Sequence, residues 1–258
     1  MRAVAVHRDA IVVTSRFWQT TATAVRASGE CLLIDSPYFP DELELLPMLL
    51  EQAGFTPVGL LATHADWDHL LGRFAFPQMS LGVGQSTGER LRAEPGAAQR
   101  ELRDADSEYY VRRPSPLSLG SYQVLPVPGR MQVGDAEIEL HPTGGHTVDG
   151  VAFMARSASL LVVGDYLSDV EIPWISPGGS IGEYRATLAR LAALVEEVEA
   201  IVPGHGAPHD RRRALEILDE DLEYLDALER GEERPSLPAG RDTKAQRKIH
   251  AENLARVH

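Results

Sequence analysis

The stretch Thr63-His64-Ala65-Asp66-Trp67-Asp68-His69 decides how the rest of the chain is interpreted. It places two imidazoles and two carboxylates close together along the backbone. The apolar run at residues 57–62 predicts a buried strand in front of it, and residues 70–74 are compatible with a short helix behind it. Imidazole and carboxylate groups are metal ligands. The stretch therefore predicts a metal site at a strand-to-helix corner.

Length and composition set the class of protein. The chain has 258 residues, of which 43% are hydrophobic and 24% charged, as in an ordinary globular protein. No change in composition divides it, so we expect one domain over residues 1–258, with residues 231–258 as a C-terminal extension that ends in a helix. No apolar run approaches the roughly 18 residues of a membrane span. The first residues lack the apolar core and cleavage site of a secretory signal.

Net charge limits the possible partners of the protein, and cysteine content indicates its compartment. The net charge of −13 makes nucleic acid and anionic membranes poor partners. We expect a small-molecule substrate, and the oligomeric state stays open. The single cysteine, Cys31, lies in an apolar run and cannot form an internal disulfide, which fits a reducing cytoplasm. We expect its thiol to be buried and unreactive.

Hydrophobic patterning predicts two groups of strands, each followed by helices. The first group covers residues 3–6, 10–14, 20–27 and 31–35, followed by a helix that starts at Asp41, ends before Gly54 and is kinked or shifted by Pro47. Residues 77–116 are harder to interpret, with a short strand at 80–83 and helices near 87–93 and 96–110. The remaining elements are strands at 122–127, 131–133, 136–141, 150–155, 159–163 and 200–202, and helices at 184–195, 210–229 and 243–256. Two sheets packed face to face with helices outside, an α+β fold, accommodate this order.

Polar residues recur where other predicted strands end. They occur in residues 141–147, 162–166 and 202–206, and, more weakly, at Asp35. Glycines flank His146, Asp165 and His205, which permits sharp turns and leaves room for an ion. A buried sheet delivers such strand ends to one rim, so we expect these residues to join the opening stretch in a metal site there.

The order of these motifs resembles the metallo-β-lactamase superfamily. That family has a strand-ending His-x-His-x-Asp-His block followed by Gly-His-Thr, Gly-Asp and Gly-His. The resemblance implies a four-layer αββα sandwich and two divalent metal ions. By position, His64 and His146 match ligands of the first metal, and Asp165 matches the carboxylate that bridges both metals. The ligands matched to the second metal are Asp68, His69 and His205.

Asp66 departs from the family pattern, because most members have a second histidine there. A carboxylate still coordinates zinc, at about 2.0–2.2 Å, but it is harder than imidazole and moves the preference towards manganese or iron. Three aspartates also leave roughly one positive charge on two divalent ions, which weakens the acidification of bound water. Zinc is favoured, with manganese or iron as alternatives. The superfamily's flavodiiron members carry glutamate at this position, which keeps a diiron site open.

The resemblance implies a hydrolase in which metal-bound hydroxide attacks a small ester, thioester or lactone. Asp68 is also the candidate catalytic proton acceptor. The alternative is a diiron redox protein, or a metal-binding scaffold whose catalysis Asp66 has weakened. Residues with further expected roles are the cleft-lining Trp67, Tyr166, Trp174 and Ile175, the ligand-orienting Thr147, His141 and Asp149, and the surface histidines His7, His209, His250 and His258.

Overall fold

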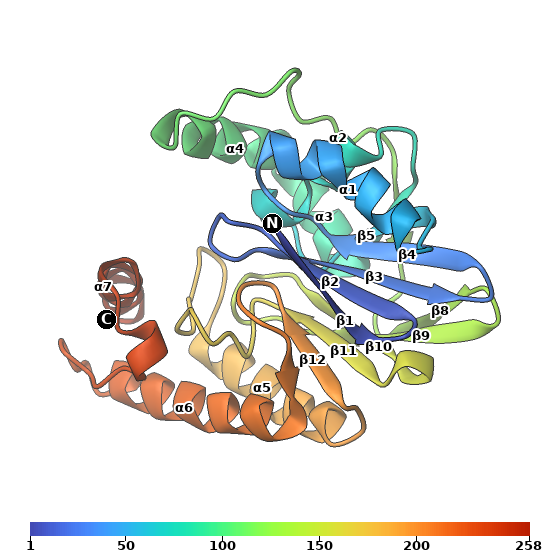
Figure 1. Cartoon of the computed structure of the whole chain (residues 1–258). Helices are drawn as coiled ribbons and strands as arrows, with labels where there is room; N and C mark the ends of the chain where they lie inside the picture. The colour runs from blue at the N-terminus through green and yellow to red at the C-terminus, as the bar shows by residue number, and fades with distance from the viewer.

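The computed structural model describes residues 1–258, which form two facing β-sheets (Figure 1). In the first sheet, β1 to β4 are antiparallel and β4 to β7 are parallel. Its strands follow chain order: β1 (Arg2–His7), β2 (Ala10–Thr14), β3 (Thr21–Ala27), β4 (Glu30–Asp35), β5 (Pro57–Ala62), β6 (Leu81–Gly84) and β7 (Tyr122–Leu125).

The second sheet is antiparallel except where β11 runs parallel to β12. Its strands, in spatial order from one edge to the other, are β13 (His209–Asp210), β12 (Ala200–Pro203), β11 (Leu160–Gly164), β10 (Val151–Ala155), β9 (Ala136–Pro142) and β8 (Gly129–Val133).

Helices cover the two outer faces, so the layers run helix, sheet, sheet, helix (Figure 1). The side of the first sheet carries α1 (Pro40–Gln52), α2 (Gly72–Ala75), α3 (Gln85–Ala93) and α4 (Ala97–Glu108). The side of the second sheet carries α5 (Ile181–Val195) and α6 (Arg211–Glu229), and α7 (Lys244–Val257) ends the chain beside α6. This arrangement confirms the predicted four-layer αββα sandwich. None of the helices combines the length and the apolar character that a membrane span requires.

Alternation along the strands creates three cores. Neighbouring residues of a strand point to opposite faces of its sheet. In β4, Leu33 packs under the helices of the first sheet while Leu32 packs between the sheets. In β11, Val162 packs between the sheets while Leu161 packs under α5 and α6. Burial on both faces explains why these strands are apolar throughout.

Most predicted elements lie within a few residues of their observed bounds. The helix predicted at residues 184–195 begins at Ile181, where the Ser180 hydroxyl accepts a hydrogen bond from the Glu183 amide and caps α5. Cys31 is buried, as predicted. The helix α1 continues through Pro47, since the lost backbone hydrogen bond is offset by the burial of Leu46 and Leu50.

Two histidines that we expected at the surface are buried. His250 bonds to the Tyr224 hydroxyl at 3.1 Å and to the Glu232 carbonyl at 2.9 Å. His209 lies in the short strand β13 and pairs with Ile201 of β12. Contacts that form only in the folded chain decide these positions, which explains why local sequence context led to the wrong expectation.

Candidate metal centre

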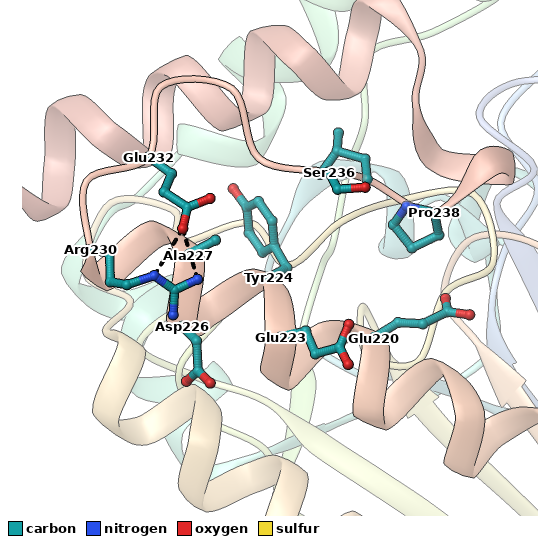
Figure 2. A pocket seen from close by; sticks show the side chains of 10 residues that line it. Glu220, Glu223, Tyr224, Asp226, Ala227, Arg230, Glu232, Ser236 and Pro238 are labelled. Atoms are coloured by element: carbon teal, nitrogen blue, oxygen red, sulfur yellow. Dashed lines mark hydrogen bonds and ion pairs between the residues drawn. The ribbon is translucent and has the colours of Figure 1, made fainter.

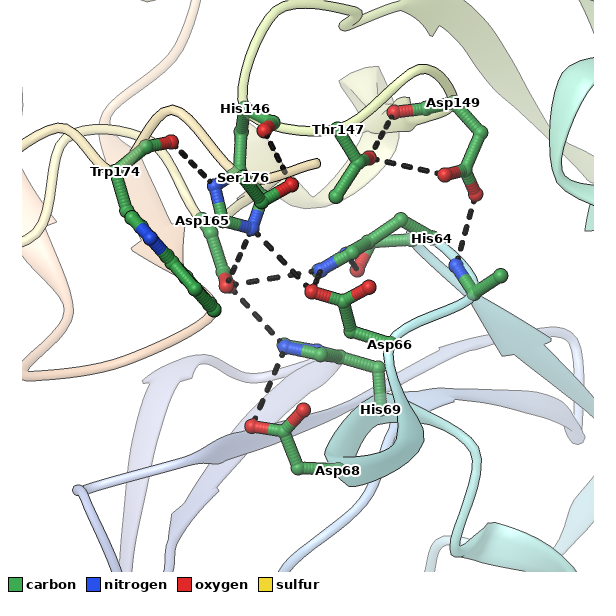
Figure 3. A network of polar contacts seen from close by, with 12 residues as sticks. His64, Asp66, Asp68, His69, His146, Thr147, Asp149, Asp165, Trp174 and Ser176 are labelled. Atoms are coloured by element: carbon green, nitrogen blue, oxygen red, sulfur yellow. Dashed lines mark hydrogen bonds and ion pairs between the residues drawn. The ribbon is translucent and has the colours of Figure 1, made fainter. Parts of the chain in front are cut away.

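Strand ends from both sheets meet at one rim. The parallel strands β4 and β5 end next to one another, and so do β11 and β12. Parallel strands place their carboxyl ends at the same edge, where ligand sites of such sheets form. These ends and the loop between β9 and β10 supply all seven predicted ligand residues, most of which Figure 3 shows pointing toward one another. The seven are His64, Asp66, Asp68, His69, His146, Asp165 and His205.

The first ligand group consists of His64, Asp66 and His146. The Oδ2 atom of Asp66 lies 3.6 Å from Nε2 of His64 and 3.6 Å from Nε2 of His146. These side chains are buried or nearly so. The distances place three candidate ligand atoms around one point.

The second ligand group consists of Asp68, His69 and His205, all buried. Oδ2 of Asp68 lies 3.3 Å from Nε2 of His205 and 3.8 Å from Nε2 of His69. Asp68 and His69 belong to the 3₁₀ turn Trp67–His69, which follows Asp66 directly. The turn brings neighbouring residues of the motif to different groups.

Asp165 lies between the two groups. Its Oδ2 atom is 3.6 Å from Nε2 of His64, 3.4 Å from that of His146 and 3.5 Å from that of His205. Its Oδ1 atom is 3.2 Å from Nε2 of His69. One carboxylate therefore faces ligand atoms of both groups.

The hydrogen bonds of the outer ring nitrogens orient the histidines. Nδ1 of His146 donates to the Trp174 carbonyl at 2.8 Å, and Nδ1 of His205 donates to the Trp18 carbonyl at 3.1 Å. A neutral imidazole that donates from Nδ1 has its lone pair on Nε2. This tautomer presents Nε2 as a metal ligand.

The inner ring nitrogens provide the test of whether metal ions fit. The Nε2 atoms of His64, His69 and His146 are buried without a hydrogen-bond partner, as is Oδ1 of Asp165. Buried polar atoms are nearly always satisfied, so this many unpaired atoms facing one another requires an explanation. Ligands at about 2.0–2.1 Å from a tetrahedral ion lie roughly 3.3 Å apart, close to the spacing observed here. The donor set fits divalent metal ions.

The charges within the cluster reinforce one another. Burial opposes ionisation of Asp165, but His69 and His205 outweigh it and hold the pKa of this carboxyl well below its usual range. Burial likewise opposes protonation of His146, while Asp165 and Asp66 raise its pKa to about 10. A cluster without metal thus holds protons that a bound cation would displace.

Position 204 requires glycine because the backbone there passes close to two candidate ligands. A Cβ atom at position 204 would lie 2.1 Å from Oδ1 of Asp165 and 2.9 Å from Cε1 of His69. Gly164, directly before Asp165, has a φ of +63°, a conformation that L side chains rarely adopt. The glycines seen in the sequence are therefore needed for packing around the ligands.

Asp35 supports the site from behind. Its Oδ2 atom accepts hydrogen bonds from Nδ1 of His69 at 3.0 Å and from the Thr63 hydroxyl at 2.8 Å. The Thr63 hydroxyl in turn lies 3.1 Å from Nδ1 of His64. Asp35 adopts a left-handed φ of 58°, a conformation that costs about 1–3 kcal/mol and that these contacts maintain. The weak strand-end signal at Asp35 thus marks a residue that orients ligands of both groups.

The remaining predicted residues lie in different surroundings. Thr147 donates to Asp149, and Asp149 accepts from the Ala65 amide, so both connect the ligand loops (Figure 3). His141 instead lies 3.3 Å from Glu139. Trp174 packs against the ring of His146, and Trp67 packs among the aromatic side chains near β2. Tyr166 and Ile175 are each 2% exposed and belong to the core under α5.

Two residues beside the cluster have no signal in the sequence. Arg90, on α3, contacts both Asp66 and Asp149. Trp18 lies beside the ring of His205, with 6.4 Å between ring centroids, and is 46% exposed. Neither residue belongs to a ligand motif, and each reaches the site through tertiary packing alone.

A separate hollow of about 610 Å³ lies between α6 and residues 232–238 (Figure 2). Glu220, Glu223, Asp226 and Glu232 line it, and Arg230 pairs with Glu232 at 2.8 Å. None of the seven candidate ligands lines this hollow. The exposed carboxylates there, such as Asp226, form no converging set of ligand atoms.

Comparison with known proteins identifies the family of the chain. The model of the metallo-beta-lactamase superfamily matches residues 15–205, which include all seven candidate ligands. The acyl-coenzyme A thioesterase MBLAC2 of Bos taurus is 27% identical over 218 residues, which cover 75% of this chain and 76% of that protein. Its Homo sapiens counterpart is 28% identical over 167 residues, covering 60% of this chain and 58% of that protein. The human match thus spans less than two thirds of that relative.

Solved structures share the fold at low identity. A metallo-beta-lactamase family protein from Thermus thermophilus, TTHA1429, has a TM-score of 0.69 and 19% identity, covering 97% of this chain and 92% of that one. The protein TTHA1623 in a di-iron-bound form has a TM-score of 0.60 and 21% identity, covering 79% of this chain and 96% of that one. At such identities the likeness concerns the fold.

Proposed function

Because the chain belongs to the metallo-beta-lactamase superfamily, we propose that it is a binuclear metal-dependent hydrolase of a small ester, thioester or lactone. One observation carries this proposal: buried, unpaired Nε2 atoms converge on a single carboxylate, Asp165. In this proposal one ion is held by His64, Asp66 and His146, the other by Asp68, His69 and His205, with Asp165 between them. Zinc is our first choice, and manganese or iron the alternatives.

Divalent ions at these positions would supply Lewis-acid polarisation of a carbonyl oxygen and would acidify water. The protein's own contribution is positioning. Trp174 and Trp18 fix the rings of His146 and His205 through their carbonyls. Asp35 fixes His69. Rigid ligand geometry of this kind spares the reacting groups a reorganisation cost.

Asp68 is the proposed proton acceptor. Burial opposes its ionisation, but His69 and His205 outweigh it and lower the pKa of the Asp68 carboxyl, so this group is an ionised acceptor at neutral pH. Its Oδ2 atom lies 3.3 Å from Nε2 of His205, at the rim of the second group. A carboxylate so placed can take a proton from a water molecule that attacks the carbonyl carbon.

An aromatic cluster beside the second group favours a substrate with an apolar part. Trp18, 46% exposed, packs on Phe17 with ring centroids 4.3 Å apart, and Tyr109 is 41% exposed. Trp67 joins the cluster at 5.9 Å from Trp18. Binding sites combine aromatic walls with a few polar groups. An acyl thioester is our preferred substrate because the curated relatives are described as acyl-coenzyme A thioesterases.

Thioester hydrolysis tests the proposal directly. Acyl-coenzyme A substrates of increasing chain length are incubated with the purified protein, and the released thiol is titrated alongside an aryl ester and a lactone. With both variants saturated with metal, Asp68→Asn should lower kcat by about 10²–10⁴-fold relative to the wild type. Asp104→Asn, an exposed carboxylate on α4, is the matched control. Undiminished turnover by Asp68→Asn with full metal content would refute its catalytic role.

The carboxylate at position 66 keeps a diiron redox protein as the second candidate. Three carboxylates suit iron better than an all-imidazole first group does, and TTHA1623 is described in a di-iron-bound form. Oxo-diiron absorption in the visible range together with oxygen consumption, without hydrolysis of any tested substrate, would favour this candidate. Bound metal with neither activity would favour a weakened scaffold.

A further inference from the structure

The two carboxylate oxygens of Asp66 face different partners. Oδ2 of Asp66 faces the Nε2 atoms of His64 and His146, each at 3.6 Å. Oδ1 lies 2.7 Å from Nη1 of Arg90. A carboxylate can bind metal through one oxygen or both, so the guanidinium leaves one oxygen free to face the ligand group.

Arg90 itself is held firmly. It extends from α3, its side chain is 14% exposed, and the same Nη1 atom donates to Oδ1 of Asp149 at 2.9 Å. Asp149 is fully buried at its side chain and accepts two further hydrogen bonds, from the Thr147 hydroxyl at 2.9 Å and from the Ala65 amide at 2.8 Å. These contacts join Arg90 to the backbone on both sides of the first ligand group.

From this arrangement we propose that Arg90, held by Asp149, is a positioning residue that makes Asp66 a ligand with a single donor atom. The ion pair with Oδ1 fixes Oδ2 at the place where an imidazole nitrogen would otherwise stand. It also offsets part of the charge that the carboxylate adds. Arg90 thereby keeps the first group suited to zinc, despite the loss of a histidine. This inference rests on the metal centre proposed above.

Loss of Arg90 should change how the first site binds metal, beyond any effect on the stability of the fold. Without the guanidinium, Oδ1 is free to coordinate, and the group becomes more anionic and harder. Removal of a group that orients a ligand typically costs about 10–100-fold in metal affinity. We therefore expect Arg90→Met to weaken zinc binding at the first site by about that factor. Arg90→Lys, which keeps the charge, should lose less.

A double-mutant cycle separates this role from a purely structural one. Zn²⁺ affinity, measured by chelator competition, is compared for wild type, Arg90→Met, Asp66→His and the double variant. If Arg90 acts on Asp66, Arg90→Met weakens binding in the wild-type background and leaves it nearly unchanged when His occupies position 66. Arg92→Met, exposed on the same helix, is the matched control and should change nothing.

Co²⁺ serves as a spectroscopic probe of coordination. Wild-type protein loaded with Co²⁺ should show the intense visible bands of low coordination number, and Arg90→Met should show weaker bands because a second oxygen binds. Equal losses of zinc affinity in both backgrounds, or unchanged affinity and spectra in Arg90→Met, would overturn the inference while leaving the metal centre intact. Wild-type protein that binds no Co²⁺ would overturn both.

Discussion

Asn253 on the C-terminal helix accepts a hydrogen bond from the backbone amide of Ile175 at 2.8 Å. Its side-chain amide also donates to the Pro173 carbonyl at 2.7 Å. Between these two residues lies Trp174, whose carbonyl orients His146. The helix α7 thus reaches the candidate metal centre through one side chain, although it is the last element of the chain.

Asn253→Ala should lower both stability and metal binding. The substitution leaves two buried backbone groups unpaired, each at a cost of about 1–3 kcal/mol. Urea denaturation measures the loss of unfolding free energy. Glu252→Ala, on the same helix, removes only a 3.9 Å contact with the exposed Lys248 and serves as control. Equal midpoints for the two variants would contradict this role of α7.

Gly204→Ala should empty the metal centre. The added methyl group would collide with Oδ1 of Asp165 and crowd His69. Metal content per chain, measured by elemental analysis, should fall to less than half of the wild-type value. Gly182→Ala on α5 is the control because its Cβ meets no atom within 4 Å, and alanine should stabilise a helix by about 0.5–1 kcal/mol there. Full metal content in Gly204→Ala would show that the site tolerates displacement of Asp165.

Metal binding should depend on pH with a definite sign. Burial lowers the pKa of His146, but Asp165 and Asp66 raise it to about 10, so the metal-free protein holds a proton there at neutral pH. That proton stabilises the metal-free fold fully below the unfolded pKa of about 6.5, and this stabilisation is lost as pH rises towards 10. Apparent metal affinity should rise over the same interval, with proton release in calorimetry. Affinity independent of pH from about 6.5 to about 9 would contradict this assignment.

Cys31 should be inert in the folded protein. Burial raises the pKa of its thiol to about 12, and the residue is 1% exposed. An aromatic disulfide reagent at about pH 8 should leave native protein unmodified and label it fully in denaturant. Rapid labelling under native conditions would mean that the first sheet opens near β4.

The seven candidate ligands could be proposed from sequence, and the fold brings them together, because each lies in a short motif at a strand end. His64 and His69 can be recognised from their spacing within one motif. Asp165 and His205 can be recognised from the glycines beside them. Arg90 could not be predicted, because its partners Asp66 and Asp149 come near it only through packing of α3. Asn253 was hidden for the same reason. Their roles depend on tertiary contacts that no local pattern records.

The cleft residues show a second limit of sequence. Trp67 and Tyr166 both adjoin ligand motifs, and composition does not distinguish them. In the fold, Tyr166 is buried, and its hydroxyl donates to the Gly144 carbonyl and accepts from the His146 amide. Trp67 lies in the partly exposed aromatic cluster with Trp18. An aromatic side chain in a sequence can be either a core residue or part of a binding surface, and only its packing in the fold shows which of the two it is.

The metal content of protein purified without added metal tests the central claim most directly. Elemental analysis of the folded chain should find two divalent ions per chain, and His146→Ala should lose the first while keeping the second. Asp35→Asn should retain both with weaker affinity, by about 10–100-fold. Fewer than half an ion per wild-type chain, even after incubation with zinc, manganese or ferrous iron, would contradict a binuclear centre.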